Sequence, residues 1–396
     1  MTASHTSLTR QELRSVLVVS LIMSIRLLGV FLLLPIFSVY GMEYKGATLP
    51  AVGLAFGIYP LVQGLLQIPY GWASDRLGRK RLLVLGLALF AAGSLYAAWA
   101  TDITHLVIAR AVQGSGAVGA VAMASLGDLT RPGVRAQAFT ITGLGIGAAF
   151  VAGLLGGPAL ASLYGFNVLF LLLAALGFLA LLVAFAFYPE TVKSGRDRTV
   201  TGPSGVLDGD LKSLYLAALV CSLTLNLFFF LYPLSWKPLG VGSDDLWRIY
   251  LVVLLPSLVF VFPYIRRAER RGNLGPAPLV GYVAMAAAFV LYLFGGAHSL
   301  PLYVTASLFF LGYSLYQAFL PAFITQRTSQ ERRGAVLGFY NLSGFIGASV
   351  GGLMAGGLFA VDKHLPLLVG LAILGLWLLL GLPSYAPSQS TTLDLG

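Results

Sequence analysis

The chain has 396 residues, of which 58% are hydrophobic and 10% are charged, and its mean hydropathy is +0.86. These values lie outside the usual range of soluble globular proteins and indicate an integral membrane protein. The formal charge of +10 does not indicate a nucleic-acid-binding protein, because the basic residues are not gathered on one soluble face. The single cysteine, Cys221, lies in an apolar segment and excludes an internal disulfide.

Apolar segments of about 20 residues recur along the chain, and each is long enough as a helix to cross a hydrocarbon core of about 30 Å. The polar N-terminal segment lacks a small-residue cleavage site, which predicts a retained first helix rather than a signal peptide. A polar stretch at 189–212 is predicted to be a cytoplasmic linker between an N-terminal half, 1–188, and a C-terminal half, 213–396, with a short tail. The apolar runs predict twelve spans, near residues 14–40, 49–73, 82–100, 104–128, 136–162, 166–188, 213–236, 246–265, 276–296, 300–326, 334–360 and 364–382.

The distribution of lysine and arginine predicts the side of the membrane on which each loop lies, since short basic loops stay in the cytoplasm. With both termini in the cytoplasm, nineteen of the 25 basic residues fall on the cytoplasmic side and four on the opposite side. The remaining two, Arg26 and Arg110, lie within spans. We therefore expect a multi-pass protein with both termini in the cytoplasm.

The two predicted halves share a spacing of small residues. A shift of 200 residues aligns Gly147 with Gly347 and Gly157 with Gly357, in the fifth and eleventh spans, although coincidence is the alternative in a chain with 47 glycines. Two glycine-rich stretches match patterns known from soluble enzymes: GSGAVG at 114–119 fits G-x-G-x-x-G, and GASVG at 347–351 fits G-x-S-x-G. Both lie within spans, where small residues let helices pack closely, so we interpret them as packing sites.

The most highly charged short segment, YGWASDRLGRKR at 70–81, joins the second and third spans. A basic cluster that only fixes the orientation of the chain in the membrane would account for the arginines and the lysine of this segment, but not for its aspartate and glycines. The segment fits the pattern G-x-x-x-D-R-x-G-R-K, and it resembles the loop motif of the major facilitator superfamily at every defining position. The matching residues are Gly71, Asp75, Arg76, Gly78, Arg79 and Lys80.

Other segments resemble motifs of the same superfamily. RAVQGSGA, with Arg110 and Gln113, resembles its fourth-helix motif, and LGVFLLLP at 28–35 resembles its first-helix pattern. The fifth-helix antiporter motif is only partly matched, because Ala161 and Ser162 stand where its final glycines belong. Together these segments resemble the bacterial drug:proton antiporters of the YajR type. The resemblance implies an all-α membrane protein with twelve transmembrane helices in two pseudo-symmetric six-helix halves, without enzymatic activity, metal or cofactor.

The resemblance also implies a latch at the cytoplasmic side. In the superfamily fold, Asp75 lies beside the start of the eleventh helix, which here begins near Gly334. A carboxylate against a helix N-terminus gains up to about 2 kcal/mol when it is partly buried. Arg79 can bridge Asp75 to Asp128, which closes the fourth span. We expect this gating motif to set the balance between outward-open and inward-open states.

Arg26 and Arg110 are expected to face a cavity, because a cation inside a membrane is costly and usually marks a functional site. The alternative is a structural arginine satisfied by backbone carbonyls. None of the 15 acidic residues falls within a membrane interior, so the predicted cavity favours neutral, anionic or zwitterionic amphipathic molecules. Other polar residues that are candidates for the cavity lining are Gln113, Tyr59, Gln63, Gln67, Asn226, Tyr313, Gln317 and Asn341.

The sequence predicts a secondary active transporter that works by alternating access, as a monomer in the bacterial cytoplasmic (inner) membrane. We expect it to export small amphipathic or drug-like molecules in exchange for protons. The midplane offers no Asp, Glu or His, and Gln317 stands where relatives can carry Glu, so Asp75 and Asp128 remain as candidate proton carriers. One alternative is a facilitator or symporter for a sugar or organic acid, and another is a membrane sensor or scaffold that transports nothing.

Overall fold

The computed structural model describes residues 7–189, 209–270, 276–295, 298–328 and 333–381. Within these residues, eleven helical segments are long and apolar enough to cross a membrane, and a shorter apolar helix covers Leu365–Leu380. Most of the predicted linker at 189–212 lies outside the described residues. The helices are α1 (Arg10–Leu33), α2 (Phe37–Gly41), α3 (Leu49–Leu77), α4 (Arg79–Ala98), α5 (Ile103–Ser115), α6 (Gly119–Asp128), α7 (Arg135–Tyr164), α8 (Phe166–Phe187), α9 (Gly209–Leu234), α10 (Leu246–Arg270), α11 (Pro276–Phe294), α12 (Ser299–Arg327), α13 (Arg333–Val361) and α14 (Leu365–Gly381), with short 3-10 turns η1 (Pro132–Val134), η3 (Lys237–Leu239) and η4 (Ser243–Asp245).

Local side-chain chemistry explains where several helices begin. Thr9 and Glu12 form a reciprocal capping box at the start of α1, and the Thr48 side chain accepts a hydrogen bond from the Ala51 amide at the start of α3. Asp102 caps α5 in the same way, by accepting from the His105 amide at 3.0 Å. Such caps satisfy amides that have no partner inside the helix, so they set where each helix begins.

Two predicted spans are not continuous helices, which corrects the sequence interpretation. The first span is interrupted at residues 34–36, which include Pro35, before the short helix α2. The fourth span is interrupted at residues 116–118, where the Ala117 amide bonds back to the Ser115 carbonyl and the Val118 amide to the Gly116 carbonyl. Hydropathy does not report such breaks, because the residues on both sides remain apolar.

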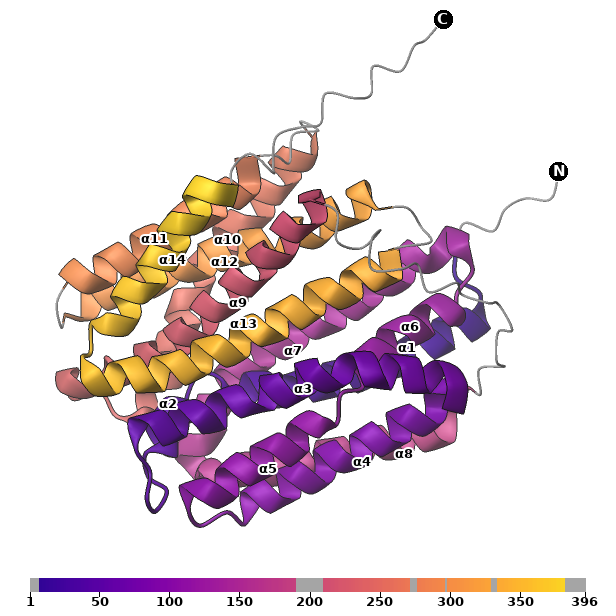
Figure 1. Ribbon diagram of the computed structural model, residues 1–396, viewed down its shortest axis with the longest axis horizontal. Coiled ribbons are helices and arrows are strands. Elements are labelled where there is room, and N and C mark those ends of the chain that lie inside the picture. The colour runs from indigo at the N-terminus through magenta and orange to yellow at the C-terminus, as the bar shows by residue number, and fades with distance from the viewer. Residues whose placement is uncertain (1–6, 190–208, 271–275, 296–297, 329–332, 382–396) are drawn as a thin grey trace, which may run out of the picture.

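The helices form two halves of six spans each, α1–α8, in which two spans are broken into two helices, and α9–α14; they are drawn in indigo to magenta and in red to yellow in Figure 1. Within each half, a glycine-rich helix packs on the first span: Gly157 of α7 meets the Leu32 carbonyl of α1, and Gly351 of α13 meets the Leu223 carbonyl of α9. The 200-residue shift therefore predicts the wrong register, since Gly147 and Gly357 have open space where a side chain would be.

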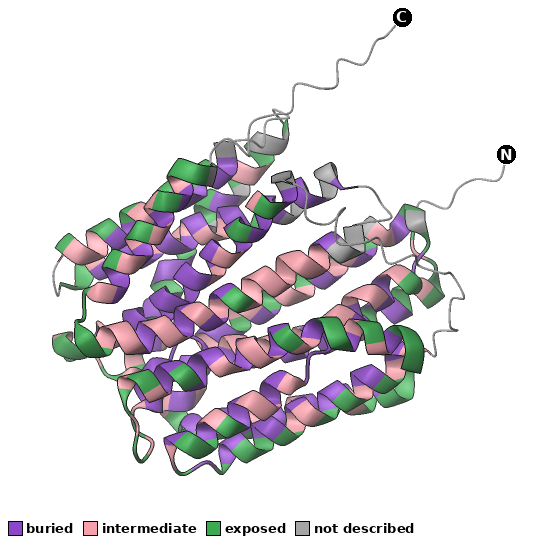
Figure 2. Ribbon diagram, viewed as in Figure 1, coloured by how far each residue is buried: buried purple, intermediate pink, exposed green. Residues whose placement is uncertain are grey.

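The two halves meet along α3 and α13, which cross the middle of Figure 1. Gly53 and Gly57 of α3 lie against Gly352 and Gly356 of α13 so closely that a methyl group on Gly53 would lie 2.9 Å from the Gly352 carbonyl oxygen. Figure 2 shows buried residues gathered where helices meet and exposed residues on the outer faces. The exposed residues include large apolar side chains on α8 and α10, as expected for helices that face lipid.

Candidate functional site

The gating motif is not a loop but the junction of two helices. α3 continues to Leu77 and α4 starts at Arg79, so only Gly78 lies between them. Gly78 has φ of +98°, which a residue with a side chain adopts only with strain, and this explains the need for glycine at that position. Consequently Asp75 lies in the last turn of α3 and Arg79 in the first turn of α4.

Arg79 is the centre of a buried ion cluster. Its Nη2 lies 2.5 Å from Asp75 Oδ1, its Nε donates to Asp128 Oδ2 at 3.1 Å, and its Nη1 donates to Ser74 Oγ. The Arg79 side chain is 7% exposed, against 22% for Asp128 and 52% for Asp75. A cation in the first turn of a helix opposes the helix dipole, and the two carboxylates compensate both charges.

The other charged residues of the motif point to neighbouring aromatic rings. The Arg76 guanidinium lies 3.8 Å from the centre of the Trp72 ring, and Lys80 Nζ lies 5.7 Å from the centre of the Phe185 ring. On the same side of the molecule, Arg131 Nε donates to Glu12 Oε1 at 2.9 Å. This hydrogen bond to a carboxylate raises the pKa of Arg131 and holds the start of α1 to the end of the fourth span.

Asp75 has no ion pair with the described residues of the eleventh span. Within the described residues its ionic partner is Arg79, and half of its side chain is exposed. Going along α3 toward Asp75, Gly64 still packs on Phe345 of α13, whereas a methyl group on Gly71 would meet only Ala120, at 3.9 Å. The structure therefore brings Asp75, Arg79 and Asp128 together at the junction of α3 and α4.

Arg110 is buried between aromatic rings. Its guanidinium carbon lies 4.4 Å from the centre of the Tyr59 ring and 5.4 Å from that of Phe37. Its Nη1 donates to Gln113 Oε1, and Gln113 Nε2 donates to Ser94 Oγ at 2.8 Å. Ring faces attract cations, so this arginine has compensation without any carboxylate. Arg110 is thus enclosed by protein, as a structural arginine would be, and does not line an open cavity.

Arg26 has a different environment. It is 2% exposed, and its Nε and Nη2 have no hydrogen-bond partner. On α3, Gln63 and Gln67 are also buried, and each has an unpartnered Oε1. A methyl group on Gly119 would lie 3.4 Å from Arg26 Nη1 and 3.5 Å from Gln67 Nε2, so these groups meet at the start of α6.

The predicted polar residues of the C-terminal half do not join this group. Gln317 Nε2 donates to Tyr313 Oη at 2.7 Å on α12, and its Oε1 accepts from Tyr340 of α13 at 3.3 Å. Asn226 is buried and donates to the Ser222 carbonyl one turn earlier, a local helix contact. Asn341 lies half-buried on α13.

Sequence reasoning missed several residues that complete these networks. Ser74, Ser94 and Tyr340 each bond to a predicted residue, and Tyr250 Oη donates to the Pro35 carbonyl of the other half at 3.0 Å. Ser94 faces Gln113 from another helix, and Tyr250 is 215 positions from Pro35, so no local pattern could reveal these pairs.

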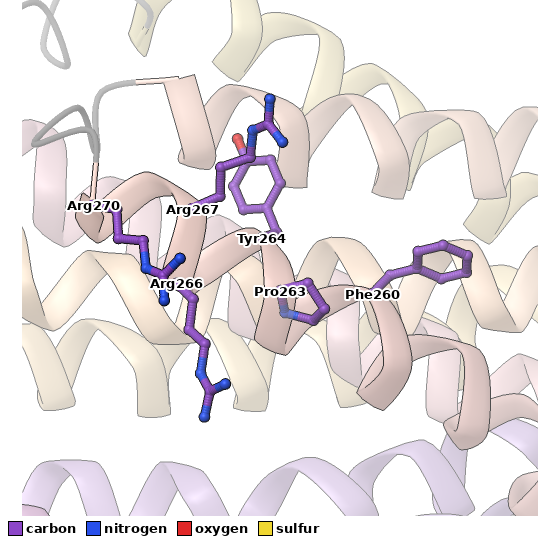
Figure 3. Close-up of a pocket in the computed structure, with 6 residues that line it drawn as sticks. All are labelled: Phe260, Pro263, Tyr264, Arg266, Arg267 and Arg270. Atoms are coloured by element: carbon purple, nitrogen blue, oxygen red, sulfur yellow. The ribbon is translucent and has the colours of Figure 1, made fainter.

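A cavity of about 720 Å³ lies at the end of α10, away from the buried polar residues, and is lined by Phe260, Pro263, Tyr264, Arg266, Arg267 and Arg270. Figure 3 shows Arg266 and Arg267 extending in opposite directions, with Arg267 beside Tyr264. The cations therefore do not converge on one point. We interpret this cavity as an open basic surface rather than as the cargo site.

Comparison with known proteins agrees with the geometry. The chain is 30% identical over 383 residues to the inner membrane transport protein YajR of Escherichia coli (strain K12), covering 94% of this chain and 83% of that protein. It is 26% identical over 338 residues to the multidrug resistance protein MdtH of Aeromonas hydrophila subsp. hydrophila, covering 84% of each. The crystal structure of a D-xylose-proton symporter superposes with a TM-score of 0.76 at 13% identity, over 95% of this chain and 97% of that one. The sequence profile of the Major Facilitator Superfamily matches residues 19–352, and this chain is a member of that family of transporters.

Proposed function

We propose that this transporter is a secondary active exporter that works by alternating access and moves small amphipathic or drug-like molecules. The observation that carries the proposal is the asymmetry along the face of α3 that packs on α13: Gly53 lies against the α13 backbone, whereas a methyl group on Gly71 would meet only Ala120 of α6. A contact that is closed at one end and open at the other is one state of a rocking cycle between two halves. The similarity to relatives such as the multidrug resistance protein MdtH supports a drug-like cargo.

We infer that both termini lie in the cytoplasm of a bacterial cell, in its inner membrane. The excess of arginine and lysine at the Asp75 end supports this orientation. The Asp75 end is then the cytoplasmic end, and the structure is open toward the cytoplasm, ready to receive cargo from inside. In the opposite state, α13 approaches Asp75 and closes this side.

We further propose that export is coupled to the uptake of protons at the gating motif. Asp75 and Asp128 are the carboxylates within reach of Arg79, and protonation of either would weaken the ion cluster. A proton could thus change the balance of states at the cytoplasmic end without any acidic group at the midplane. This assigns coupling to the gating motif, and it leaves Gln317 as an orienting residue.

Flux into proteoliposomes with an imposed pH gradient tests the proposal. The purified protein is reconstituted and offered lipophilic dyes, organic anions and sugars, with protein-free vesicles and a protonophore as controls. We expect amphipathic molecules to move against their gradient only while the pH gradient lasts. Downhill movement of a sugar or organic acid without any pH effect would instead favour the facilitator, and movement of no compound would favour a sensor or scaffold.

A further inference from the structure

The break in the fourth span creates a helix N-terminus inside the protein. α6 begins at Gly119, part-way along the span Ile103–Asp128, and its cap residue Val118 offers no side-chain hydrogen bond. The amides of the break, at residues 116–118, bond to carbonyls two or three residues earlier in the chain. In the described part of the chain, no backbone carbonyl outside α6 accepts from Gly119, Ala120 or Val121. These amides and the helix dipole give this end of α6 a partial positive charge.

The Arg26 guanidinium lies beside this N-terminus. Its Nη1 is 3.4 Å from where a methyl group on Gly119 would lie, and Gln67 Nε2 is 3.5 Å from the same point. Arg26 is only 2% exposed, and yet its Nε and Nη2 have no hydrogen-bond partner. A full positive charge and the positive end of a helix thus face one another with unused donors on both.

No carboxylate of the described residues offsets these charges. Asp128 lies at the opposite end of α6, where it is bonded to Arg79 together with Asp75. Two positive groups that face each other in a low-dielectric interior repel, and an anion placed between them would be attracted by both. The other buried arginines are compensated: Arg79 has two carboxylates, and Arg110, whose Nε also lacks a hydrogen-bond partner, has two ring faces and Gln113.

We propose that Arg26 and the N-terminus of α6 form an anion site that binds the carboxylate of an amphipathic cargo, with Gln67 as a further donor. A carboxylate matches the site because its two oxygens pair with the planar fork of a guanidinium, while a free oxygen lone pair accepts from the amides. The carboxylate as cargo rests on the proposed function, whereas the anion site itself does not. The apolar part of such a molecule would lie among the apolar side chains of the surrounding spans.

Thermal unfolding of the purified protein with formate, against formamide at equal ionic strength, tests the anion site without any assumption about cargo. We expect formate to raise the melting temperature by about 2–4 °C and formamide to have no effect. Arg26→Gln should remove the formate effect and leave the melting temperature of the anion-free protein equal or higher, because an uncompensated cation is lost. A purely structural Arg26 would instead lower it. Gly119→Ala should weaken the formate effect, and Gly127→Ala in the same helix, where a methyl group has open space, should not.

Binding and flux of 2-naphthoate and 2-naphthamide then test the cargo. We expect at least about tenfold tighter binding of the acid, and loss of this preference in Arg26→Gln and in Gly119→Ala. Equal binding of acid and amide, or a preference that survives both substitutions, overturns the inference, as does the absence of any formate effect. Flux of the amide with no preference for the acid would overturn the carboxylate site and leave the proposed export standing. A formate effect without flux of any compound would overturn export and leave the anion site standing.

Discussion

The two ends of the α3–α13 pair differ in the kind of group that they present to the other half. At the Leu49 end, glycines of both helices let the backbones touch, and a side chain at Gly356 would fall against the Leu49 carbonyl and 2.8 Å from Gly53 Cα. At the Asp75 end, a methyl group on Gly71 of α3 would meet only Ala120 of α6, and the nearby groups are the charged side chains of Asp75, Arg79 and Asp128. One end depends on shape and the other on charge.

This difference suggests how each end can open and close. The attraction between closely packed backbones weakens within about an ångström of separation, so the helices at the Leu49 end are either in contact or separated. Charge interactions act over several ångströms and respond to protonation, so the Asp75 end can be adjusted by pH and cargo.

The largest effect is expected from filling the glycine contact. Gly356→Val places a branched side chain against the backbone of α3, which cannot move aside without separating the two helices. Overpacking of this kind costs about 3 kcal/mol, so we expect the Leu49 end to open in most molecules. Electron–electron distances between spin labels at Leu77 of α3 and Leu337 of α13 should become shorter as the Asp75 end closes.

Gly338→Val is the matched control on the same helix. A side chain at Gly338 has open space, and exchanging glycine for valine in a helix changes stability by only a few tenths of a kcal/mol. We expect its label distances to equal those of the parent protein. If Gly356→Val and Gly338→Val behave alike, shape does not hold the Leu49 end. Cys221 is buried, so it should not react with the label in either variant.

The second effect concerns the ion cluster. Asp128→Asn replaces a charge-assisted hydrogen bond to a buried arginine by a neutral one, and we expect a loss of about 2 kcal/mol in the free energy of unfolding. Titration with sodium dodecyl sulfate measures this loss. In a double-mutant cycle with Arg79→Gln, the two losses should not add, because both remove the same pair. Additive losses would show that Asp128 acts through another contact.

A smaller effect is expected at the polar contact between the halves. Tyr250→Phe removes the hydroxyl that donates to the Pro35 carbonyl and leaves that buried carbonyl unpaired, at a cost of about 1 kcal/mol. Because the bond joins the two halves, label distances should shift toward the closed Asp75 end about fivefold in population. Tyr282→Phe is the control, since Tyr282 donates to Ala217 within one half and should alter stability without altering the distances.

Much of the fold could be predicted from sequence because the membrane permits few solutions. Apolar length identifies the spans, since a backbone in lipid must be helical to satisfy its polar groups. The ends were less predictable: α3 runs four residues beyond its predicted end, to Leu77, because helices continue into water past their apolar part. The break at residues 116–118 depends on backbone hydrogen bonds, which hydropathy does not detect.

The candidate site could be predicted only in part. Helical spacing correctly places Tyr59, Gln63 and Gln67 on one face of α3, and all three are buried. Spacing alone could not show that Arg110 is enclosed by rings while Arg26 lacks partners, because both are single arginines in apolar spans. That distinction comes from contacts between helices far apart in sequence.

Substitution of Asp75 is expected to have the smallest effect on stability. It is also the most direct test of the difference between the Leu49 end and the Asp75 end. Asp75→Asn removes a half-exposed ion pair, which is worth less than about 1 kcal/mol here. If Asp75 meets the α13 N-terminus in the other state, the same change removes a helix-dipole contact there, worth about 0.5–1 kcal/mol. We therefore expect nearly unchanged unfolding but a two- to fivefold loss of molecules with the Asp75 end closed, measured by the Leu77 and Leu337 labels.

Asp245→Asn provides the control for this last prediction. Asp245 is 51% exposed and pairs with Arg248 at 2.7 Å three residues later, so it loses an ion pair of the same kind. It lies in η4, at the Leu49 end of the molecule, away from the charged junction of α3 and α4. Equal shifts in the two variants would mean that surface charge in general biases the states. A shift in Asp75→Asn alone would mean that this carboxylate closes the adjustable end, in a state where it has left solvent for α13.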